Sequence, residues 1–356
     1  MQILHFLEFQ EHGKSVTVKC MVGRNTLIGR RAAILDIEGE YVAQTERLGG
    51  RIIKVRQGIP VGINLFDIDL DEDEDFIDID SKITEIRSII YGIINKYENR
   101  SLRAGEIADI EKAVKEVYHE KEITRDKNSI YEKRGGKVEG QITLGNIKKK
   151  MPTLNDFYRV MKDKIKNTEL ANTLSNFLRD STLGIFDCQS TLEIKDQLIC
   201  FDISEIKDEI MRYYVSLVLT TWITNKYMAT KERNKRYVVV DEAWNLFKNK
   251  ETSDFLENLA RRARKKKVAM ILATQNLSEL RQSRQAEAII NCCDTIILLK
   301  QSLGSIDEIM KFFKLPEGVK NILLRARPGE CILIKGGEIR AIKIDMTKYE
   351  SKFITT

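Results

Sequence analysis

Gly13, Lys14 and Ser15 have the residue types and spacing that binding of a phosphate group requires, because they precede a run that can form a helix, VTVKCMV. The first amides of a helix have no partner within the helix and can bind a phosphate. A lysine neutralises phosphate oxygens, and a serine hydroxyl can be a Mg²⁺ ligand. The tripeptide therefore predicts a phosphate-binding loop, with Ser15 as a metal ligand.

The full phosphate-loop pattern, GxxxxGK[ST], is incomplete in this sequence. Its first glycine would fall at position 8, where the chain has Glu8. Two explanations stay open: the loop is degenerate, or residues are missing from the sequence just before Gly13. We favour the second, because every motif further along the chain fits a nucleotide-binding protein.

Asp241 and Glu242 form the strongest chemical signal, since they follow RYVVV at 236–240, a run typical of a buried strand. The last residues of a central parallel strand lie at the carboxyl edge of the sheet, where nucleotides bind. There Asp241 would hold Mg²⁺ through water, and Glu242 would polarise the attacking water. The alternative is a pair of carboxylates at a helix start. The strand before them and the upstream GKS favour the catalytic interpretation.

Two further polar groups end predicted strands. Gln275 closes the run VAMILATQ and could hold the attacking water or contact a γ-phosphate; the alternative is an amide that completes a turn. Asp36 and Glu38 follow the run AAIL near the same edge and could orient water or metal. An ordinary exit from a strand into a turn is the alternative for these two acids. We predict all three as part of the nucleotide site.

A basic run, in which six of the seven residues from 261 to 267 are Lys or Arg, closes the predicted helix before the VAMILATQ strand. Cations at a helix carboxyl terminus interact favourably with the helix dipole, which is the simplest explanation. An arginine that acts across a subunit boundary on transition-state charge is the second explanation. A nucleic-acid contact is the third, although no aromatic residues interleave the run.

The elements that must position these residues alternate between strand and helix. Strand-like runs occur at 3–9, 32–35, 51–55, 197–203, 236–241, 268–274 and 294–300, and helical patterns lie at 207–229, 251–266 and 284–293. Such alternation predicts an α/β fold with a parallel sheet covered by helices on both faces. Two terminal runs, 330–335 and 338–344, flank Gly336-Gly337 and predict a β-hairpin.

A helical, polar segment interrupts this pattern between 67 and 182. Ile83, Ile86 and Ile90 recur at helical spacing there. The segment opens with nine acidic residues among positions 67–80, which favour a solvated connector over a Ca²⁺ loop of the EF-hand type, because the glycine of such a loop is missing. We predict an ATPase core over 1–66 and 183–356, with a helical insertion subdomain over 67–182.

Composition excludes several other classes of protein. The 356 residues are 31% charged and 42% hydrophobic, and the net charge of +6 is too small to indicate nucleic-acid binding by itself. The six cysteines show no CxxC pair or histidine partner, which favours a reducing compartment. No apolar stretch approaches the roughly 20 residues that span a bilayer, and no signal peptide is evident. We therefore expect a soluble, cytoplasmic protein.

Taken in order, these motifs resemble the HerA/FtsK-type ATPases, and more closely the large ATPase of conjugative type IV secretion, the fourth VirB component with its TrbE- and TraC-like relatives. The segments that carry the resemblance are GKS, ILDIEGEY, LGIFD, VVVDEAW, LENLARRARKKKVAMILATQNLSEL, IINCCDTIIL and RARPGECIL. The resemblance covers nearly the whole chain, and its most specific part is 236–299. It implies a RecA-like P-loop NTPase core.

Residue by residue, the resemblance implies that Lys14 and Ser15 are the phosphate-loop pair. It makes Asp241 the metal-binding acid and Glu242 the catalytic acid, and Gln275 matches the glutamine motif of the family. At Glu8 this sequence departs from the phosphate-loop pattern of the family.

Three arginines are also implied. Arg264, eleven residues before Gln275, matches the trans-acting arginine of the related coupling ATPases, and Arg262 is the fallback. Arg327, before Pro328-Gly329, is a candidate phosphate contact.

The function implied is a Mg²⁺-dependent ATPase, the motor domain that energises a type IV secretion or conjugation apparatus. Its partners would be other subunits of the apparatus and further copies of itself, as a hexamer when full length or a monomer when isolated. The resemblance also implies the carboxyl-terminal ATPase portion of a protein held at the bacterial inner membrane through partners or an amino-terminal domain. The alternatives are a DNA translocase of the same superfamily and a nucleotide-binding assembly subunit without turnover.

Overall fold

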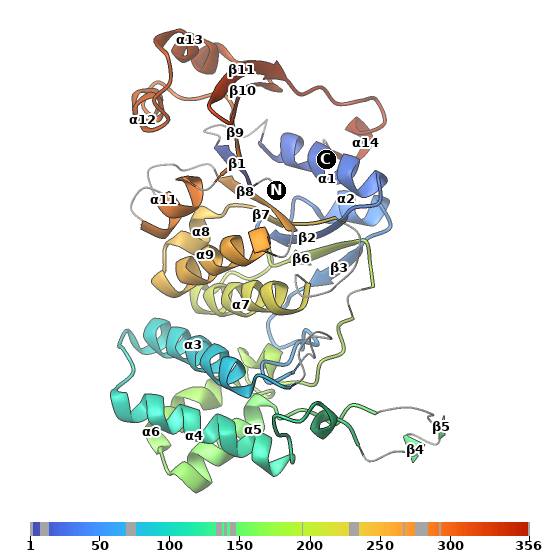
Figure 1. Cartoon of the computed structure of the whole chain (residues 1–356), viewed down its shortest axis with the longest axis vertical. Helices are drawn as coiled ribbons and strands as arrows, with labels where there is room; N and C mark the ends of the chain where they lie inside the picture. The colour runs from blue at the N-terminus through green and yellow to red at the C-terminus, as the bar shows by residue number, and fades with distance from the viewer. Residues whose placement is uncertain are drawn as a thin grey trace. The chain divides into compact units, whose positions relative to one another are not determined.

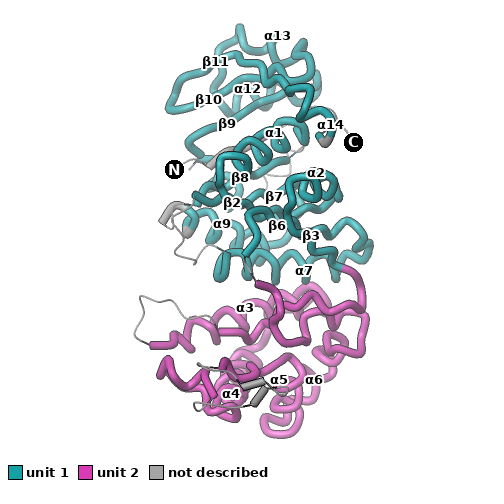
Figure 2. The backbone as a smooth tube through the Cα atoms, turned by 90° about the vertical axis from the view of Figure 1, so that its right-hand side faces the viewer, with its two compact units in different colours: residues 1–55, 194–356 teal, residues 56–193 magenta. Residues whose placement is uncertain are grey.

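The computed structural model describes residues 3–7, 14–68, 76–132, 137–138, 141–142, 147–193, 195–227, 235–265, 268–274, 284–291 and 293–354. The chain divides into two compact units (Figure 2). Residues 1–55 and 194–356 form the first, here termed the sheet unit, and residues 56–193 form the second, the helical unit. The insertion predicted over 67–182 falls within the helical unit.

The sheet unit is built on one sheet with the strand order β11-β10-β9-β1-β8-β7-β2-β6-β3. Neighbouring strands from β9 to β3 run parallel, whereas β10 and β11 are antiparallel to their neighbours. The strands are β1 (Ile3–Leu7), β2 (Arg31–Asp36), β3 (Arg51–Lys54), β6 (Leu198–Asp202), β7 (Arg236–Val240), β8 (Val268–Thr274), β9 (Thr295–Leu298), β10 (Glu330–Lys335) and β11 (Glu338–Lys343). The predicted α/β class and parallel sheet are confirmed.

Helices cover both faces of this sheet (Figure 1). They are α1 (Lys14–Leu27), α2 (Val42–Arg47), α7 (Glu209–Trp222), α8 (Trp244–Phe247), α9 (Lys250–Lys265), α11 (Arg284–Asn291), α12 (Ile306–Phe312), α13 (Glu317–Arg325) and α14 (Ser351–Ile354). Helices α1 and α2 lie on one face, and α7 and α9 lie on the other. Strands β2, β6 and β7 are buried along their whole length, which explains their continuous apolar sequences.

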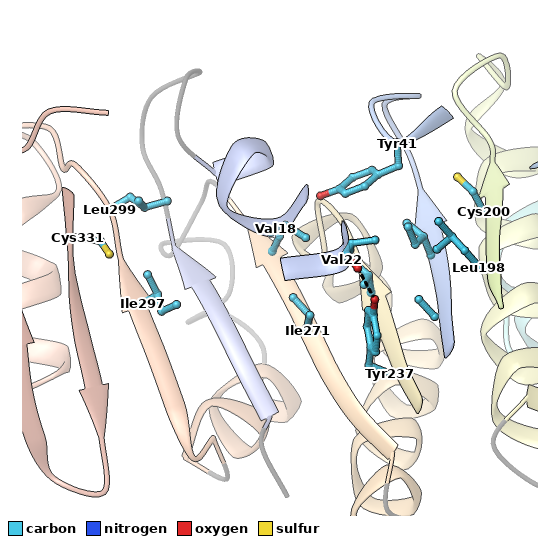
Figure 3. Close-up of a cluster of buried hydrophobic side chains, with 14 residues drawn as sticks. Val18, Val22, Tyr41, Leu198, Cys200, Tyr237, Ile271, Ile297, Leu299 and Cys331 are labelled. Carbon is cyan, nitrogen blue, oxygen red and sulfur yellow. Dashed lines mark hydrogen bonds between the residues drawn. The ribbon is translucent and has the colours of Figure 1, made fainter. Parts of the chain in front are cut away.

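The core beneath α1 shows how the strand period places side chains. Val18 and Val22 of α1 pack in one apolar cluster with alternate residues of the strands, including Ile34 and Ile271 (Figure 3). The hydroxyl of Tyr237 on β7 donates to the carbonyl oxygen of Val22 at 2.8 Å. This contact anchors α1 to the strand that carries the acidic pair.

The helical unit contains α3 (Ile79–Glu98), α4 (Ala104–Glu120), α5 (Leu154–Arg159), α6 (Thr168–Leu174) and the short strands β4 (Lys137–Val138) and β5 (Gln141–Ile142). Asp78 caps α3 by accepting the Ser81 amide at 3.0 Å, and Asn99 ends it in a left-handed conformation. Ile83, Ile86 and Ile90 are buried, as their helical spacing predicts.

One predicted element differs in kind. The helix expected over 207–229 is α7 up to Trp222 and a wider, π-helical turn over Ile223–Tyr227. The hydroxyls of Thr220, Thr221 and Thr224 each donate to a carbonyl four residues earlier, at 2.7–2.8 Å. Such back-bonding competes with the backbone ladder and loosens a helix.

In the part of the chain described, no helix is both long and apolar enough to cross a membrane.

Candidate functional site

Four neighbouring strands, β1, β8, β7 and β2, end within two residues of one another at the carboxyl edge of the sheet. Leu7 of β1 pairs with Thr274 of β8, and Val240 of β7 pairs with Leu272 of β8 and Leu35 of β2. Helix α1 begins at Lys14, so residues 8–13 join it to β1. This strand–loop–helix order is the one that a phosphate loop requires. Glu8 and Gly13 themselves lie outside the described residues.

Lys14, Asp241 and Glu242 meet at this edge, 227 and 228 positions apart in sequence. The Lys14 ammonium donates to Oδ1 of Asp241 at 2.8 Å and to Oε1 of Glu242. All three side chains are buried. The structure thus brings together the predicted phosphate-binding lysine and both predicted acids.

Burial and charge oppose each other in this cluster. Burial alone lowers the pKa of Lys14, but the Asp241 and Glu242 carboxylates outweigh it, so the pKa stands above its ordinary value. Burial also raises the pKa of Asp241, and the attraction of Lys14 offsets only part of that rise. One ammonium group therefore serves two buried carboxylates, and a further cation would be attracted to them.

The turn after β7 directs the two acids. Glu242 has φ +47°, in the left-handed region that residues other than glycine seldom adopt. Its amide donates to Oδ1 of Asp241 at 3.0 Å, and its carbonyl oxygen accepts the Asn245 amide at 3.0 Å. The Ala243 amide donates to the Ala273 carbonyl at the end of β8, at 2.8 Å. A strained backbone that is held by several contacts is common at functional sites.

Asp36 has a different surrounding from Asp241. Its carboxylate accepts the backbone amides of Gly39, Glu40 and Tyr41 at 2.8–3.1 Å and so fixes the turn between β2 and α2. Burial raises the pKa of Asp36 to about 6 against the effect of these amide donors. Glu38 is exposed on the same turn.

Glu40 was not predicted as a site residue, although it belongs to the same motif. Its Oε2 atom is buried and has no hydrogen-bond partner among the described residues, and its charge acts on Asp241. Nothing in the sequence distinguishes Glu40 from Glu38. The different positions of the two glutamates follow from the turn that Asp36 holds. In this turn Gly39 has φ +77°, and a Cβ atom added to Gly39 would lie 2.8 Å from the Ser204 hydroxyl.

The remaining predicted residues are placed only in part. Gln275 lies outside the described residues, immediately after β8. Arg262 and Arg264 lie on α9, although nothing is described of their side chains. Arg327 is exposed and its amide donates to Oε2 of Glu330 at 2.8 Å. Because β10 is antiparallel to β9, this loop before β10 lies at the same carboxyl edge.

Oxygen atoms suited to Mg²⁺ are available beside Lys14. Oδ2 of Asp241 is buried and has no hydrogen-bond partner among the described residues, and Ser15 is the second residue of α1. Mg²⁺ is held in nucleotide sites by one or two protein oxygens together with phosphates and water. The described residues hold no cluster of three or more His, Cys, Asp or Glu arranged to bind a metal without such additional ligands. The donor set therefore fits a nucleotide-bound Mg²⁺.

A parallel sheet with a lysine at the start of the first helix and an acidic pair at the end of a nearby strand defines a P-loop NTPase domain. The family model for the TraG P-loop domain matches residues 7–330, and the chain belongs to this family. The resemblance to conjugative ATPases predicted from the motifs is confirmed.

Known structures and proteins are similar to this chain. The structure of VirB4 of Thermoanaerobacter pseudethanolicus is 24% identical with a TM-score of 0.78, covering 99% of this chain and 91% of that chain. A form of the bacterial conjugative coupling protein TrwB, with sulphate, is 10% identical with a TM-score of 0.61, covering 97% and 85%. The DNA import protein CedB of Sulfolobus acidocaldarius is 26% identical over 126 residues, which span 33% of this chain and only 21% of that protein.

Proposed function

We propose that this chain is the ATP-hydrolysing motor domain of a type IV secretion or conjugation apparatus. The observation that carries the proposal is the buried cluster in which Lys14 contacts both Asp241 and Glu242 at the carboxyl edge of the sheet. Family membership and the fold shared with VirB4 support it. So does the structure of TrwB, 11% identical with a TM-score of 0.52 over 99% of this chain and 80% of that chain, which contains the non-hydrolysable ATP analogue ADPNP.

In this proposal the phosphate groups of ATP displace Lys14 from the two carboxylates. The ammonium then binds the β- and γ-phosphate oxygens, and the amides at the start of α1 bind the phosphates as well. Asp241 and Ser15 hold Mg²⁺, which supplies positive charge to the phosphate oxygens when bound. Gly13 belongs to the same phosphate loop.

Glu242 then directs a carboxylate oxygen towards the attacking water. The water oxygen bonds to the γ-phosphorus, the bond from that phosphorus to the ADP oxygen breaks, and Glu242 accepts the proton of the water. ADP and inorganic phosphate leave, and the proton passes to solvent.

The other predicted residues complete the proposal. Gln275 orients the water or contacts the γ-phosphate, and Arg264 of a neighbouring copy stabilises transition-state charge, with Arg262 as the alternative. Arg327, Asp36 and Glu38 act at the edge of the nucleotide site, Asp36 by fixing the turn after β2.

At the level of the whole chain, we further propose a core over 1–66 and 183–356 with an insertion over 67–182. The protein would act in the cytoplasm, against the inner membrane through partners, and as a hexamer when full length.

Steady-state ATP hydrolysis with Mg²⁺ tests the proposal when the wild type is compared with Glu242→Gln. We expect turnover to fall by about 10²–10⁴-fold in the variant while ATP binding is retained. Glu338→Gln is the matched control, because Glu338 lies on β11 and its side chain is 67% exposed. Binding without turnover in the wild type would instead support an assembly subunit, and absence of binding would overturn the nucleotide site.

A DNA translocase is the second candidate, because the chain is similar to a DNA import protein. Hydrolysis stimulated by duplex DNA, with an affinity for DNA that falls steeply as salt rises, would support it. Hydrolysis that is indifferent to DNA at low salt would count against it.

A further inference from the structure

Trp244, the first residue of α8, contacts the predicted catalytic acid directly. Its indole Nε1–H donates to Oε2 of Glu242 at 2.6 Å, while Oε1 of the same carboxylate accepts from Lys14. The Glu242 carboxylate is therefore held by two donors of different kinds. The lysine is a cation that nucleotide phosphates attract, and the indole is a neutral donor that they do not attract comparably.

The indole ring is itself held in place. The Lys248 ammonium lies 3.9 Å from the centroid of the Trp244 ring, which is a cation–π contact. In addition, the Ala243 amide donates a hydrogen bond to the Ala273 carbonyl of β8, which fixes the turn before Trp244 to the sheet. A tryptophan side chain has only two rotatable bonds, so these contacts leave its N–H group a well-defined direction.

We propose that Trp244 is a positioning residue, which keeps the Glu242 carboxylate in its hydrolytic orientation after ATP has drawn Lys14 away. The inference rests on the proposed function. Once Lys14 binds phosphate, Trp244 still donates to Oε2, and Oε1 is the oxygen that accepts the proton of the attacking water. Without the indole N–H, the carboxylate could rotate and the water would lose its alignment with the γ-phosphorus.

Two substitutions separate the hydrogen bond from the bulk of the ring. Trp244→Phe keeps an aromatic ring but removes the N–H donor. Trp244→His keeps a donor, because Nε2 of histidine is two bonds from Cγ, as Nε1 of tryptophan is. Loss of a partner that orients a metal ligand typically lowers activity by 10- to 100-fold, and Trp244 orients a carboxylate in a comparable way. We expect Trp244→Phe to lower kcat by about that factor, with KM and the Kd for Mg²⁺–ADPNP unchanged, and Trp244→His to recover a large part of the loss.

A double substitution tests whether the effect acts through Glu242. In the Glu242→Gln background, Trp244→Phe should leave the residual turnover unchanged, because the acid that Trp244 positions is no longer present. Independent roles would give multiplicative losses and would overturn the inference. An equal fall of kcat in Trp244→Phe and Trp244→His would also overturn it, since the bulk of the ring would then be what matters.

Two other causes of lost turnover can be told apart from failure of the inference. One is misfolding of the variant, and the other is failure of the proposed function. If Trp244→Phe no longer binds ADPNP, β-benzothienylalanine at position 244 of a Trp222→Phe protein provides the same test, because sulfur replaces N–H in a ring of the same shape. Trp222 and Trp244 are the two tryptophans of the chain. Full turnover in that protein, beside a Glu242→Gln protein without turnover, would refute the inference and leave the proposed function intact. If Glu242→Gln turns over normally, the role of Glu242 as the catalytic acid fails and the inference about Trp244 fails with it, whereas a wild type without turnover contradicts the proposed function.

Discussion

At the scale of single residues, the site depends on one cation that serves two buried acids. Lys14 and Asp241 have 3% and 0% of their side chains exposed, so water contributes little to their solvation. A buried charge without its partner is strongly unfavourable, whereas the intact pair roughly offsets its own desolvation. The unfavourable desolvation of the two acids is therefore offset only while a cation is present.

Lys14→Met removes this cation and should destabilise the fold by about 3 kcal/mol at pH 7.5, since the acids are left buried and unpaired. Without Lys14 the pKa of Asp241 rises further above its ordinary value, so the folded variant binds a proton more readily than the folded wild type. The deficit in the free energy of unfolding should then shrink as the pH falls from 7.5 to 5. Urea unfolding of both proteins at the two pH values measures it.

The double variant Lys14→Met/Asp241→Asn is the control for this prediction. It replaces one of the two charged carboxyl groups with a neutral amide and should regain part of the lost stability, with a smaller dependence on pH than the single variant shows. A deficit of equal size at pH 7.5 and pH 5 in the single variant would show that the charge of the buried acids is not the cause.

The sequence predicted the members of this cluster but not its immediate neighbours. A lysine after glycine and two acids after an apolar strand are local patterns, and the parallel order of the strands brings them to one edge. The hydrogen bond from Trp244 to Glu242 depends on a backbone with φ +47°, which no local pattern indicates. The buried oxygen of Glu40 likewise depends on a turn fixed by tertiary contacts.

At the scale of elements, the carboxyl-terminal segment holds α1 and α2. Arg24 of α1 donates to both carboxylate oxygens of Glu350, at 2.7 and 3.0 Å, and to the Asp345 carbonyl at 2.7 Å. Lys19 of α1 donates to the Ile354 carbonyl at 3.2 Å, and Arg47 of α2 donates to that of Lys352. The helix that begins with Lys14 is thus fixed from outside by residues more than 300 positions away.

Glu350→Gln should lower the free energy of unfolding by about 1–2 kcal/mol near pH 7, a modest value because half of Arg24 is exposed. The hydrogen bonds of Arg24 lower the pKa of Glu350 to about 2 from an ordinary 4.5. A lowered folded-state pKa stabilises the fold above about pH 4.5, and this contribution is lost as the pH falls towards 2. Unfolding in urea at pH 7, 4 and 3 should show the two proteins converging.

Glu338→Gln is the matched control here as well, because the Glu338–Arg340 pair has side chains that are 67% and 68% exposed. It should change stability by well under 1 kcal/mol at every pH. Parallel curves for wild type and Glu350→Gln down to pH 3 would exclude the ionic contact as the source of the stability.

Elements with a long, regular pattern were predictable, and short ones were not. The strand predicted at 268–274 coincides with β8, since seven consecutive apolar or small residues admit few alternatives. Helix α12 was not predicted, because its two turns provide only Ile306, Ile309 and Met310 as buried positions. The seven residues of α12 are fewer than the roughly 11 over which a helical period can be recognised. The contact between Arg24 and Glu350 joins residues 326 apart, for which a single sequence contains no signal.

At the scale of the whole molecule, the helical unit is closed by its own backbone. The Gly62 carbonyl accepts the amides of Thr191 and Leu192 at 3.0 and 3.1 Å, and the Val61 amide donates to the Ile185 carbonyl at 3.0 Å. The chain thus enters and leaves this unit through segments that are bonded to each other. A unit whose ends meet can be separated from the rest of the chain without cutting through its core.

Residues 56–193 produced alone should therefore fold as a helical domain with a single cooperative urea transition, observed by circular dichroism.

Two glycine substitutions test whether the closure supports this fold. Gly58 and Gly62 both have positive φ, but a Cβ atom at Gly58 meets nothing within 4 Å, whereas one at Gly62 would lie 2.3 Å from the Thr191 hydroxyl. Each change to alanine costs about 1 kcal/mol for its backbone conformation alone. We expect Gly62→Ala to lose at least 1 kcal/mol more than Gly58→Ala, because Thr191 must move away from the bonded ends. Equal losses would show that the closure contributes nothing, and a fragment without a cooperative transition would show that residues 56–193 need the sheet unit in order to fold.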